Sequence, residues 1–217
     1  MPAPPRRILL ASTNNAKLGK LWWLLDGLGL ELLVPDESNS LPQPREDGPS
    51  HIANAERKAI EASRALGLAA IASDGGLVIP VLGDRWHSLY TGRFAGSGAT
   101  DQERLDALLE LMQHYEGQRR SAHWTEAVAL ADRGYLLGSW EAESPPGLLD
   151  RRYDKIVPGF WGFSVWRLPQ FGKRYPDLTP EELDQLDDHW SRLREQVRGY
   201  FVEHQGPHIE RTQKTPR

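Results

Sequence analysis

The feature that most constrains the fold is residues 68–79, where two apolar runs are separated by one carboxylate and two glycines. Residues 68–72 favour a buried strand that ends at Asp74. A strand end would hold this carboxylate rigidly, and Gly75 and Gly76 would let a ligand approach the backbone closely. The alternative is an Asp-Gly turn between two strands, which is the commoner arrangement for this local sequence. The polar and charged motifs elsewhere in the chain favour a functional site at this stretch.

The bulk composition fits a soluble globular protein, because 39% of the 217 residues are hydrophobic and 26% are charged. This length fits one large domain or two small lobes, with a sizeable core. A net charge of −4 gives no sign of a nucleic-acid or membrane surface. Disulfides and thiolate metal sites are excluded by the absence of cysteine. Neither a membrane-spanning run nor a signal-peptide core is recognisable, so a cytoplasmic location is expected.

The first strand, expected at residues 8–11, runs into a polar turn and then into a helix at residues 16–28. A strand, a polar turn and a helix in this order point backbone N–H groups at an anion. Three side chains of the turn can instead simply cap the helix: Ser12, Thr13 and Asn14. Lys17 argues against capping alone, because a cation is unfavourable beside a helix N-terminus. The turn therefore favours an anionic ligand, although it lacks the GxxxxGK spacing of a Walker P-loop.

A second helix, expected at residues 51–66, leads directly into the Asp74 strand. Asn54 and Lys58 are four residues apart and therefore share one face of this helix. Either they are merely solvated, which is the commoner outcome for such a pair, or they overhang the same site as Asp74. Arg93 lies between glycines in a long loop, where it is either a clamp for an anion or an ordinary surface arginine.

The remainder of the chain predicts a helix opened by the capping box of Thr100 and Glu103, and then mostly antiparallel structure. The expected elements are strands at 122–131 and 135–143, a loop at 144–161, a short strand at 163–166 and one long helix at 179–203. Early alternation of strands and helices followed by an antiparallel ribbon predicts an α/β fold with a mixed sheet. We expect a single domain of two lobes over residues 1–204 and a polar C-terminal tail over residues 205–217.

Several motifs, taken in chain order, resemble those of the inosine triphosphate pyrophosphatase family, the house-cleaning enzymes for non-standard purine nucleoside triphosphates. The family's T-x-N-x-x-K turn resembles STNNAK at residues 12–17, and its E-x-G resembles EDG at 46–48. Its N-A-x-x-K-A helix is similar to NAERKA at 54–59, and its D-D-S-G-L to SDGGL at 73–77. An S-A-R-Y-A-G loop appears as TGRFAG at 91–96. Their order and spacing over residues 8–197 resemble a divergent member of that family.

The resemblance implies a strongly twisted mixed sheet flanked by helices, with a nucleotide cleft between two lobes. It implies a metal-dependent hydrolase that converts a nucleoside triphosphate to the monophosphate and pyrophosphate. Mg²⁺ is the expected metal, with Mn²⁺ as the alternative, because phosphate chemistry favours hard cations held by oxygen ligands. A homodimer is expected from the resemblance alone, and neither a nucleic-acid polymer nor a membrane is an expected partner.

The resemblance also assigns roles to residues of the matched motifs. Asp74 would position or deprotonate the attacking water, and Glu46 and Asp74 would hold the metal. Lys17 and Lys58 would bind phosphate oxygens and stabilise the charge that develops on the leaving pyrophosphate. The substrate-binding residues expected beside them are Ser12, Thr13, Asn14, Asn54, Gly75, Arg93, Phe160 and His189.

Some positions depart from the family pattern. Ser73 and Gly75 stand where the family carries an acidic residue and a serine, and Lys20 replaces an acidic residue after the turn. Asp47 is a candidate to replace the missing carboxylate. The family's G-F-G-Y-D-P segment reads GFWGFS at residues 159–164, without the aspartate. Its S-H-R signature aligns with Asp-Asp-His, which ends at His189, the residue expected to keep basic character, while Phe160 remains able to stack on a base.

The motifs expected to bind phosphates and metal are thus largely present, whereas those expected to recognise the base differ from the family pattern. The sequence predicts a nucleoside triphosphate pyrophosphatase with an altered base preference. The alternative is a catalytically impaired relative that binds a nucleotide or a partner protein without turnover. A third interpretation, chance matches in an unrelated α/β domain, is disfavoured by the order of the motifs.

Overall fold

The computed structural model describes residues 5–36, 41–42, 45–96 and 98–204. In this part of the chain eight strands form one mixed sheet of order β2-β1-β3-β4-β6-β7-β8, with β5 also paired to β4. The strands are β1 (Arg7–Leu10), β2 (Glu31–Leu33), β3 (Ala69–Val78), β4 (Ser121–Asp132), β5 (Tyr135–Glu143), β6 (Gly147–Leu149), β7 (Trp166–Leu168) and β8 (Lys173–Arg174). The β1 pairings with β2 and β3 are parallel and the others are antiparallel, which confirms the predicted mixed α/β fold.

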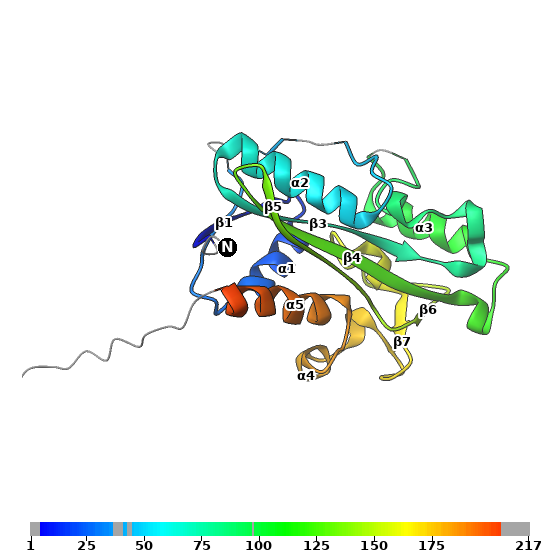
Figure 1. Cartoon of the computed structure of the whole chain (residues 1–217). Helices are drawn as coiled ribbons and strands as arrows, with labels where there is room; N and C mark the ends of the chain where they lie inside the picture. Colours follow the sequence, from blue (N-terminus) through cyan, green and yellow to red (C-terminus); the bar gives the residue numbers. More distant parts are fainter. Residues whose placement is uncertain (1–4, 37–40, 43–44, 97, 205–217) are drawn as a thin grey trace, which may run out of the picture.

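Five α-helices flank the sheet in the described residues: α1 (Asn15–Leu25), α2 (His51–Leu66), α3 (Asp101–Leu111), α4 (Pro180–Asp184) and α5 (His189–His204). Figure 1 shows α2 on one face of the twisted sheet and α1 and α5 on the opposite face. The predicted α2 bounds are confirmed, with Ser50 capping the N-terminus and Gly67 in the left-handed region at the C-terminus. The predicted capping box of α3 is also confirmed. No helix of the described part is long and apolar enough to span a bilayer.

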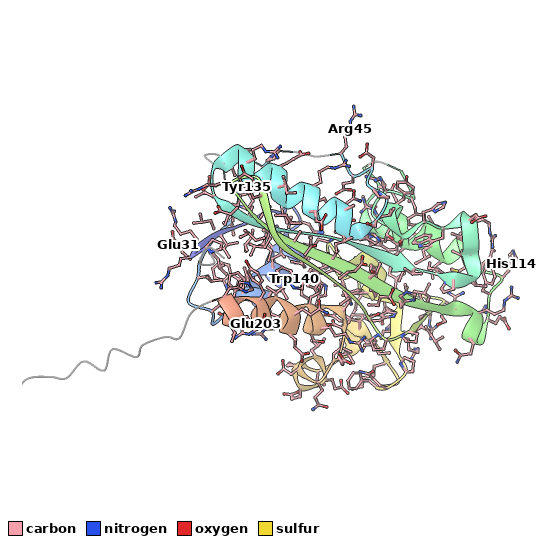
Figure 2. The ribbon with its side chains drawn as sticks, in the orientation of Figure 1. Glu31, Arg45, His114, Tyr135, Trp140 and Glu203 are labelled. Atoms are coloured by element: carbon pink, nitrogen blue, oxygen red, sulfur yellow. The ribbon has the colours of Figure 1, made fainter. Side chains whose placement is uncertain are left out.

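The two faces of the sheet bury side chains of different size. Under α2 the core is built mainly of alanines, including Ala55 and Ala59 on the helix and Ala72 on β3. Under α1 and α5 it is built of larger side chains, and Figure 2 shows Trp140 of β5 facing α5, where its ring lies 5.5 Å from that of Tyr200. The small residues let α2 approach the sheet closely, which brings its polar N-terminal half over the middle of β3.

The prediction that the strand ends at Asp74, and the alternative of an Asp-Gly turn, are both wrong. β3 continues through Gly75 and Gly76 to Val78, and every residue of it pairs with β4. A Cβ at position 76 would lie 2.7 Å from Thr91 Oγ1, so the neighbouring loop uses this space. The glycines therefore allow close packing along a continuous strand, and Asp74 projects from its middle.

Three later boundaries also differ from the predictions. The expected loop at 144–161 contains β6, and the strand expected at 163–166 is a 3₁₀-helix over Trp161–Val165 that precedes β7. The single long helix expected at 179–203 is interrupted between α4 and α5, because the Asp188 carboxylate accepts a hydrogen bond from the Ser191 N–H at 2.9 Å and so starts a new helix. The division into two lobes stays a prediction, and the expected tail at 205–217 lies outside the described residues.

Candidate active site

A cavity of about 990 Å³ opens beside β3 and gathers side chains from distant parts of the chain. Of the twelve residues assigned to the site from the sequence, eleven line this cavity: Ser12, Thr13, Asn14, Lys17, Glu46, Lys58, Asp74, Gly75, Arg93, Phe160 and His189. Asn54 does not line it. This residue is 1% exposed and lies behind Asp74, where its side-chain N–H donates to the carboxylate at 3.4 Å.

Asp74 is the centre of the polar end of the cleft, and α2 surrounds it with donors. Its Oδ1 accepts from Lys58 Nζ at 2.7 Å, and its Oδ2 accepts from His51 Nδ1 at 2.7 Å. These donors and Asn54 occupy positions 51, 54 and 58 of one helix, so they share one face. His51 also contacts Ser88 through Nε2 at 3.1 Å.

The electrostatics of this cluster favour the ionised form of Asp74. Burial opposes ionisation, but the His51 hydrogen bond and the charges of Lys58 and Lys17 outweigh it and lower the pKa of Asp74 to about 2. Burial likewise opposes the charge on Lys58, yet Asp74 and Glu46 together raise the pKa of that ammonium above its ordinary value. Both groups are therefore fully charged at neutral pH.

Lys58 joins the two carboxylates that were expected to hold a metal. Its Nζ lies 2.6 Å from Glu46 Oε1 and 2.7 Å from Asp74 Oδ1, so one ammonium sits between two carboxylates. Two carboxylates facing one cationic centre match the way Mg²⁺ is usually held, with phosphates and water completing its shell. Among the described residues no group of three or more His, Asp or Glu side chains gathers as a metal cluster. Glu46 and Asp74 are thus the two carboxylates that these residues offer to a cation at this place.

The loop around Glu46 is tied to the opposite wall of the cleft. Arg93 donates from Nη1 to Glu46 Oε2 at 3.1 Å and from Nη2 to the Glu46 carbonyl at 2.6 Å. Asp47, the candidate replacement for the missing carboxylate, lines the cavity but accepts a hydrogen bond from Arg57. This hydrogen bond holds the pKa of Asp47 below its ordinary value.

The β1–α1 turn combines capping with access to the cleft. Asn14 Oδ1 accepts from the backbone N–H groups of Ala16 at 2.8 Å and Lys17 at 3.2 Å, so the capping interpretation holds for this residue. Its Nδ2 donates to the Gly159 carbonyl at 3.0 Å, which links the turn to the far side of the cleft. Lys17 extends across the cavity instead and donates to Glu126 Oε1 at 2.8 Å.

Aromatic rings form the other end of the cleft. Phe160 stacks on Phe163 with ring centroids 5.2 Å apart and an interplanar angle of 14°, and Trp124 stacks on His189 at 6.4 Å and 19°. Burial, together with the charges of Lys20, Lys17 and Arg192, holds the pKa of His189 well below its ordinary value. Burial thus favours the neutral form of the His189 imidazole, and its part in substrate binding stays a prediction.

Several buried nitrogens of the aromatic cluster have no hydrogen-bond partner within the described residues, among them Trp124 Nε1 and His189 Nδ1. Both side chains line the cavity. Buried polar atoms of this kind are rare in folded proteins, so they indicate groups that a ligand or a water completes.

Sequence reasoning missed two functional candidates. His51 lies three residues before Asn54 on the same helical face, and this spacing is the signal that would have found it. Glu126 is 3% exposed and stands in β4 directly before the apolar run at residues 127–131. A lone charge in such a strand is costly without a partner, so it was a visible sign of a polar contact.

The fold and the cleft together define an α/β protein whose cleft pairs a charged end with an aromatic end. The sequence model of the Ham1 family matches residues 8–148, and the chain belongs to this family. This assignment confirms the resemblance to the inosine triphosphate pyrophosphatases that the motifs indicated.

Similar proteins cover nearly the same length. A dITP/XTP pyrophosphatase of Coxiella burnetii is 31% identical over 202 residues, which are 90% of this chain and 96% of the relative. One from Desulfotalea psychrophila is 30% identical over 188 residues, 87% of this chain and 82% of the relative. The solved HAM1 protein of Coxiella burnetii superposes with a TM-score of 0.76 at 28% identity, covering 91% of this chain and 98% of that one.

Proposed function

We propose that the protein hydrolyses a non-standard purine nucleoside triphosphate to the monophosphate and pyrophosphate. Its family membership and the dITP/XTP pyrophosphatases among its relatives support this activity. The observation that carries the proposal is the Glu46–Lys58–Asp74 arrangement on the cleft wall, with Lys17 and Arg93 nearby on the same cavity. Cations at one end and aromatic rings at the other match the two halves of a nucleotide.

The charged end is suited to a triphosphate because ion pairs with neighbouring carboxylates hold its cations in place. Lys58 and Arg93 both pair with Glu46, and Lys17 pairs with Glu126. Phosphate oxygens accept strong hydrogen bonds from such groups, and Arg93 presents a planar fork that suits bidentate contacts. A bound triphosphate would thus take over part of the contacts that the carboxylates now make.

Asp74 is better suited to orienting water than to taking its proton. A carboxylate with a pKa of about 2 is a weak base at neutral pH, and only its ionised form accepts hydrogen bonds at both oxygens. Held by α2 on the rigid β3 strand, it would direct a water at the α-phosphorus. A new bond then forms from the water oxygen to that phosphorus, while the bond to the bridging oxygen of the leaving pyrophosphate breaks.

Negative charge grows on the pyrophosphate as it leaves, and the ammonium groups of Lys17 and Lys58 would stabilise it. We propose that Glu46 and Asp74 hold Mg²⁺, with Mn²⁺ as a substitute. When bound, the metal would neutralise phosphate charge and orient the triphosphate. The attacking water loses its proton to solvent or to phosphate oxygen, because the Asp74 carboxyl, with a pKa of about 2, does not retain it.

The proposed activity is tested by pyrophosphate release. Purified protein would be incubated with standard, deaminated and otherwise modified triphosphates, with Mg²⁺, with Mn²⁺ and with EDTA. We expect metal-dependent release of pyrophosphate that is fastest with at least one non-standard purine triphosphate. Release from none of them by folded protein would contradict the proposal, and a nucleotide-induced rise in melting temperature without turnover would establish the impaired, binding-only relative instead.

A homodimer and a cytoplasmic location are further proposals, which rest on the resemblance and on the composition. Light scattering coupled to size exclusion would give a mass near twice the 24.5 kDa of one chain if the protein is a dimer. A mass of one chain would contradict it. Fractionation of the cells that make the protein would test the location.

A further inference from the structure

Glu126 is a buried carboxylate at the charged end of the cleft. Its side chain is only 4% exposed, and it lines the cavity from the middle of β4. The hydrogen-bonding partner described for it is Lys17, whose Nζ lies 2.8 Å from Oε1 although the two residues are 109 positions apart. Lys17 belongs to one of the motifs that resemble the family, whereas Glu126 belongs to none of them. The roles proposed above therefore give the Glu126 carboxylate no part in the reaction.

Gly75 leaves the space that this carboxylate occupies. The two residues are direct partners in the β3–β4 ladder. A Cβ at position 75 would lie 2.6 Å from the carboxyl carbon of Glu126 and 2.6 Å from the carbonyl oxygen of Thr125. Gly75 is not among the glycines with positive φ, so its backbone conformation does not demand glycine. The Thr125 backbone carbonyl and the Glu126 carboxylate together leave no room for a larger side chain here.

The same face of β3 carries Ser73, because side chains two residues apart in a strand point to the same side. Ser73 Oγ is buried and has no hydrogen-bond partner within the described residues. Ser73 stands where the family motif has its first acidic residue, and Glu126 lies diagonally across from it on the neighbouring strand. The carboxylate of this face is therefore supplied by β4.

Stability alone does not account for a buried ion pair at this place. Replacing such a pair with apolar side chains of similar volume is often neutral or stabilising, because desolvation offsets the attraction. Lys17, Glu126 and Asp74 all line the same cavity. The pair thus holds an ammonium on the cavity that also contains the group expected to orient water.

We propose that Glu126 is a positioning residue for the proposed pyrophosphatase reaction, which holds the Lys17 ammonium at the phosphate end of the cleft while Gly75 leaves room for it. Glu126 acts through Lys17, by fixing where the ammonium meets the phosphates. This inference rests on the proposed function, and its test separates the two.

The test is a double-mutant cycle of Lys17→Met and Glu126→Gln, measured as kcat and KM on the fastest triphosphate. Glu126→Gln keeps the shape and removes the charge, so we expect kcat/KM to fall about 10-fold. Lys17→Met should cost about 100-fold, and the double variant should be no slower than Lys17→Met alone. Glu126→Asp keeps the charge and should recover part of the loss.

The matched control is Glu56→Gln on α2, which loses a carboxylate bonded to Ser139 at 2.7 Å outside the cleft and should keep kcat. Circular dichroism would check the fold of each variant, and Glu126→Ala takes the place of Glu126→Gln if the latter does not fold. Effects of Lys17→Met and Glu126→Gln that multiply, or a Glu126→Gln variant as fast as the unmodified protein, would overturn the proposal.

A binding measurement, which needs no turnover, separates the proposed activity from the positioning role of Glu126. If the unmodified protein hydrolyses no triphosphate, the proposed function fails, and the same cycle is run on the Kd of inorganic tripolyphosphate by calorimetry. We then expect Glu126→Gln to weaken binding only when Lys17 is present. Equal weakening in both backgrounds, or no binding of tripolyphosphate by the unmodified protein, would overturn the positioning role.

Discussion

The two ends of the cleft hold their functional groups by different physical means. At the charged end, Lys58, Asp74 and Glu46 hold one another through short ion pairs, and α2 adds His51 behind them. At the aromatic end, stacked rings and burial fix the side chains, and Trp124 and His189 each keep a nitrogen without a partner in the described part of the chain. A ligand must exchange contacts at the first end, whereas it adds contacts at the second.

This difference separates the residues proposed to act in hydrolysis from those proposed to contact the base. A mutual ion-pair network tolerates little change, because removing one charge leaves its partner buried and unpaired. A stacked aromatic wall tolerates substitution of one ring by another of similar volume. The structure thus explains how the charged end can keep the family motifs while the aromatic end departs from them.

The largest expected effect comes from Asp74→Asn at the charged end. The change removes the anion that accepts from three donors of α2, so we expect turnover to fall roughly a thousandfold. Steady-state pyrophosphate release measures this effect. Asp150→Asn, which breaks an ion pair with Arg167 outside the cleft, is the control and should retain turnover. Equal turnover for Asp74→Asn and the unmodified protein would remove Asp74 from the mechanism.

Lys58→Met should have the next largest effect, about 100-fold on kcat/KM, because it deletes a charged donor to phosphate and leaves two carboxylates facing each other. Lys173→Met is matched to it, since Lys173 pairs with Glu182 at 2.7 Å away from the cavity. The two variants would be compared in one assay series. A loss that is the same in both would show that Lys58 acts only on general stability.

The pH dependence of stability tests how strongly the charged end holds Asp74. Its pKa is about 2 in the folded protein against an ordinary 3.8, so ionisation favours folding. The contribution, about 2 kcal/mol, is fully present above the ordinary pKa and is lost as the pH falls through about 2. Urea unfolding of the unmodified protein and Asp74→Asn should therefore differ near pH 6 and converge towards pH 2. A difference that stays constant with pH would contradict this origin.

The smallest expected effect lies at the aromatic end. Phe160→Ala should raise KM for a nucleoside triphosphate about 10-fold, the loss typical of one base-stacking ring. The affinity for inorganic tripolyphosphate should stay unchanged, because this ligand has no base. Calorimetry with both ligands makes the comparison, and a parallel loss for tripolyphosphate would show that the two ends are not independent.

Local patterns predicted much of the charged end. The helix over 51–66, the turn with Lys17 and the Asp74 stretch each lie within one short segment, so their spacing alone indicated an anion site. The prediction failed where neighbours decided the outcome. β3 continues past Asp74 because β4 pairs with all ten of its residues, and glycines that suggested a turn serve that pairing instead.

By itself, the sequence determined the family, the mixed α/β class and the identity of the charged side chains, because each depends on motifs a few residues long and on their order. Only the tertiary structure decided which charges meet and which are lost. The β3–β4 register places Glu126 opposite Gly75, where Lys17 of α1 reaches it, and burial lowers the pKa of the His189 imidazole. Register and desolvation arise from packing between segments far apart in the chain, and no local pattern records them.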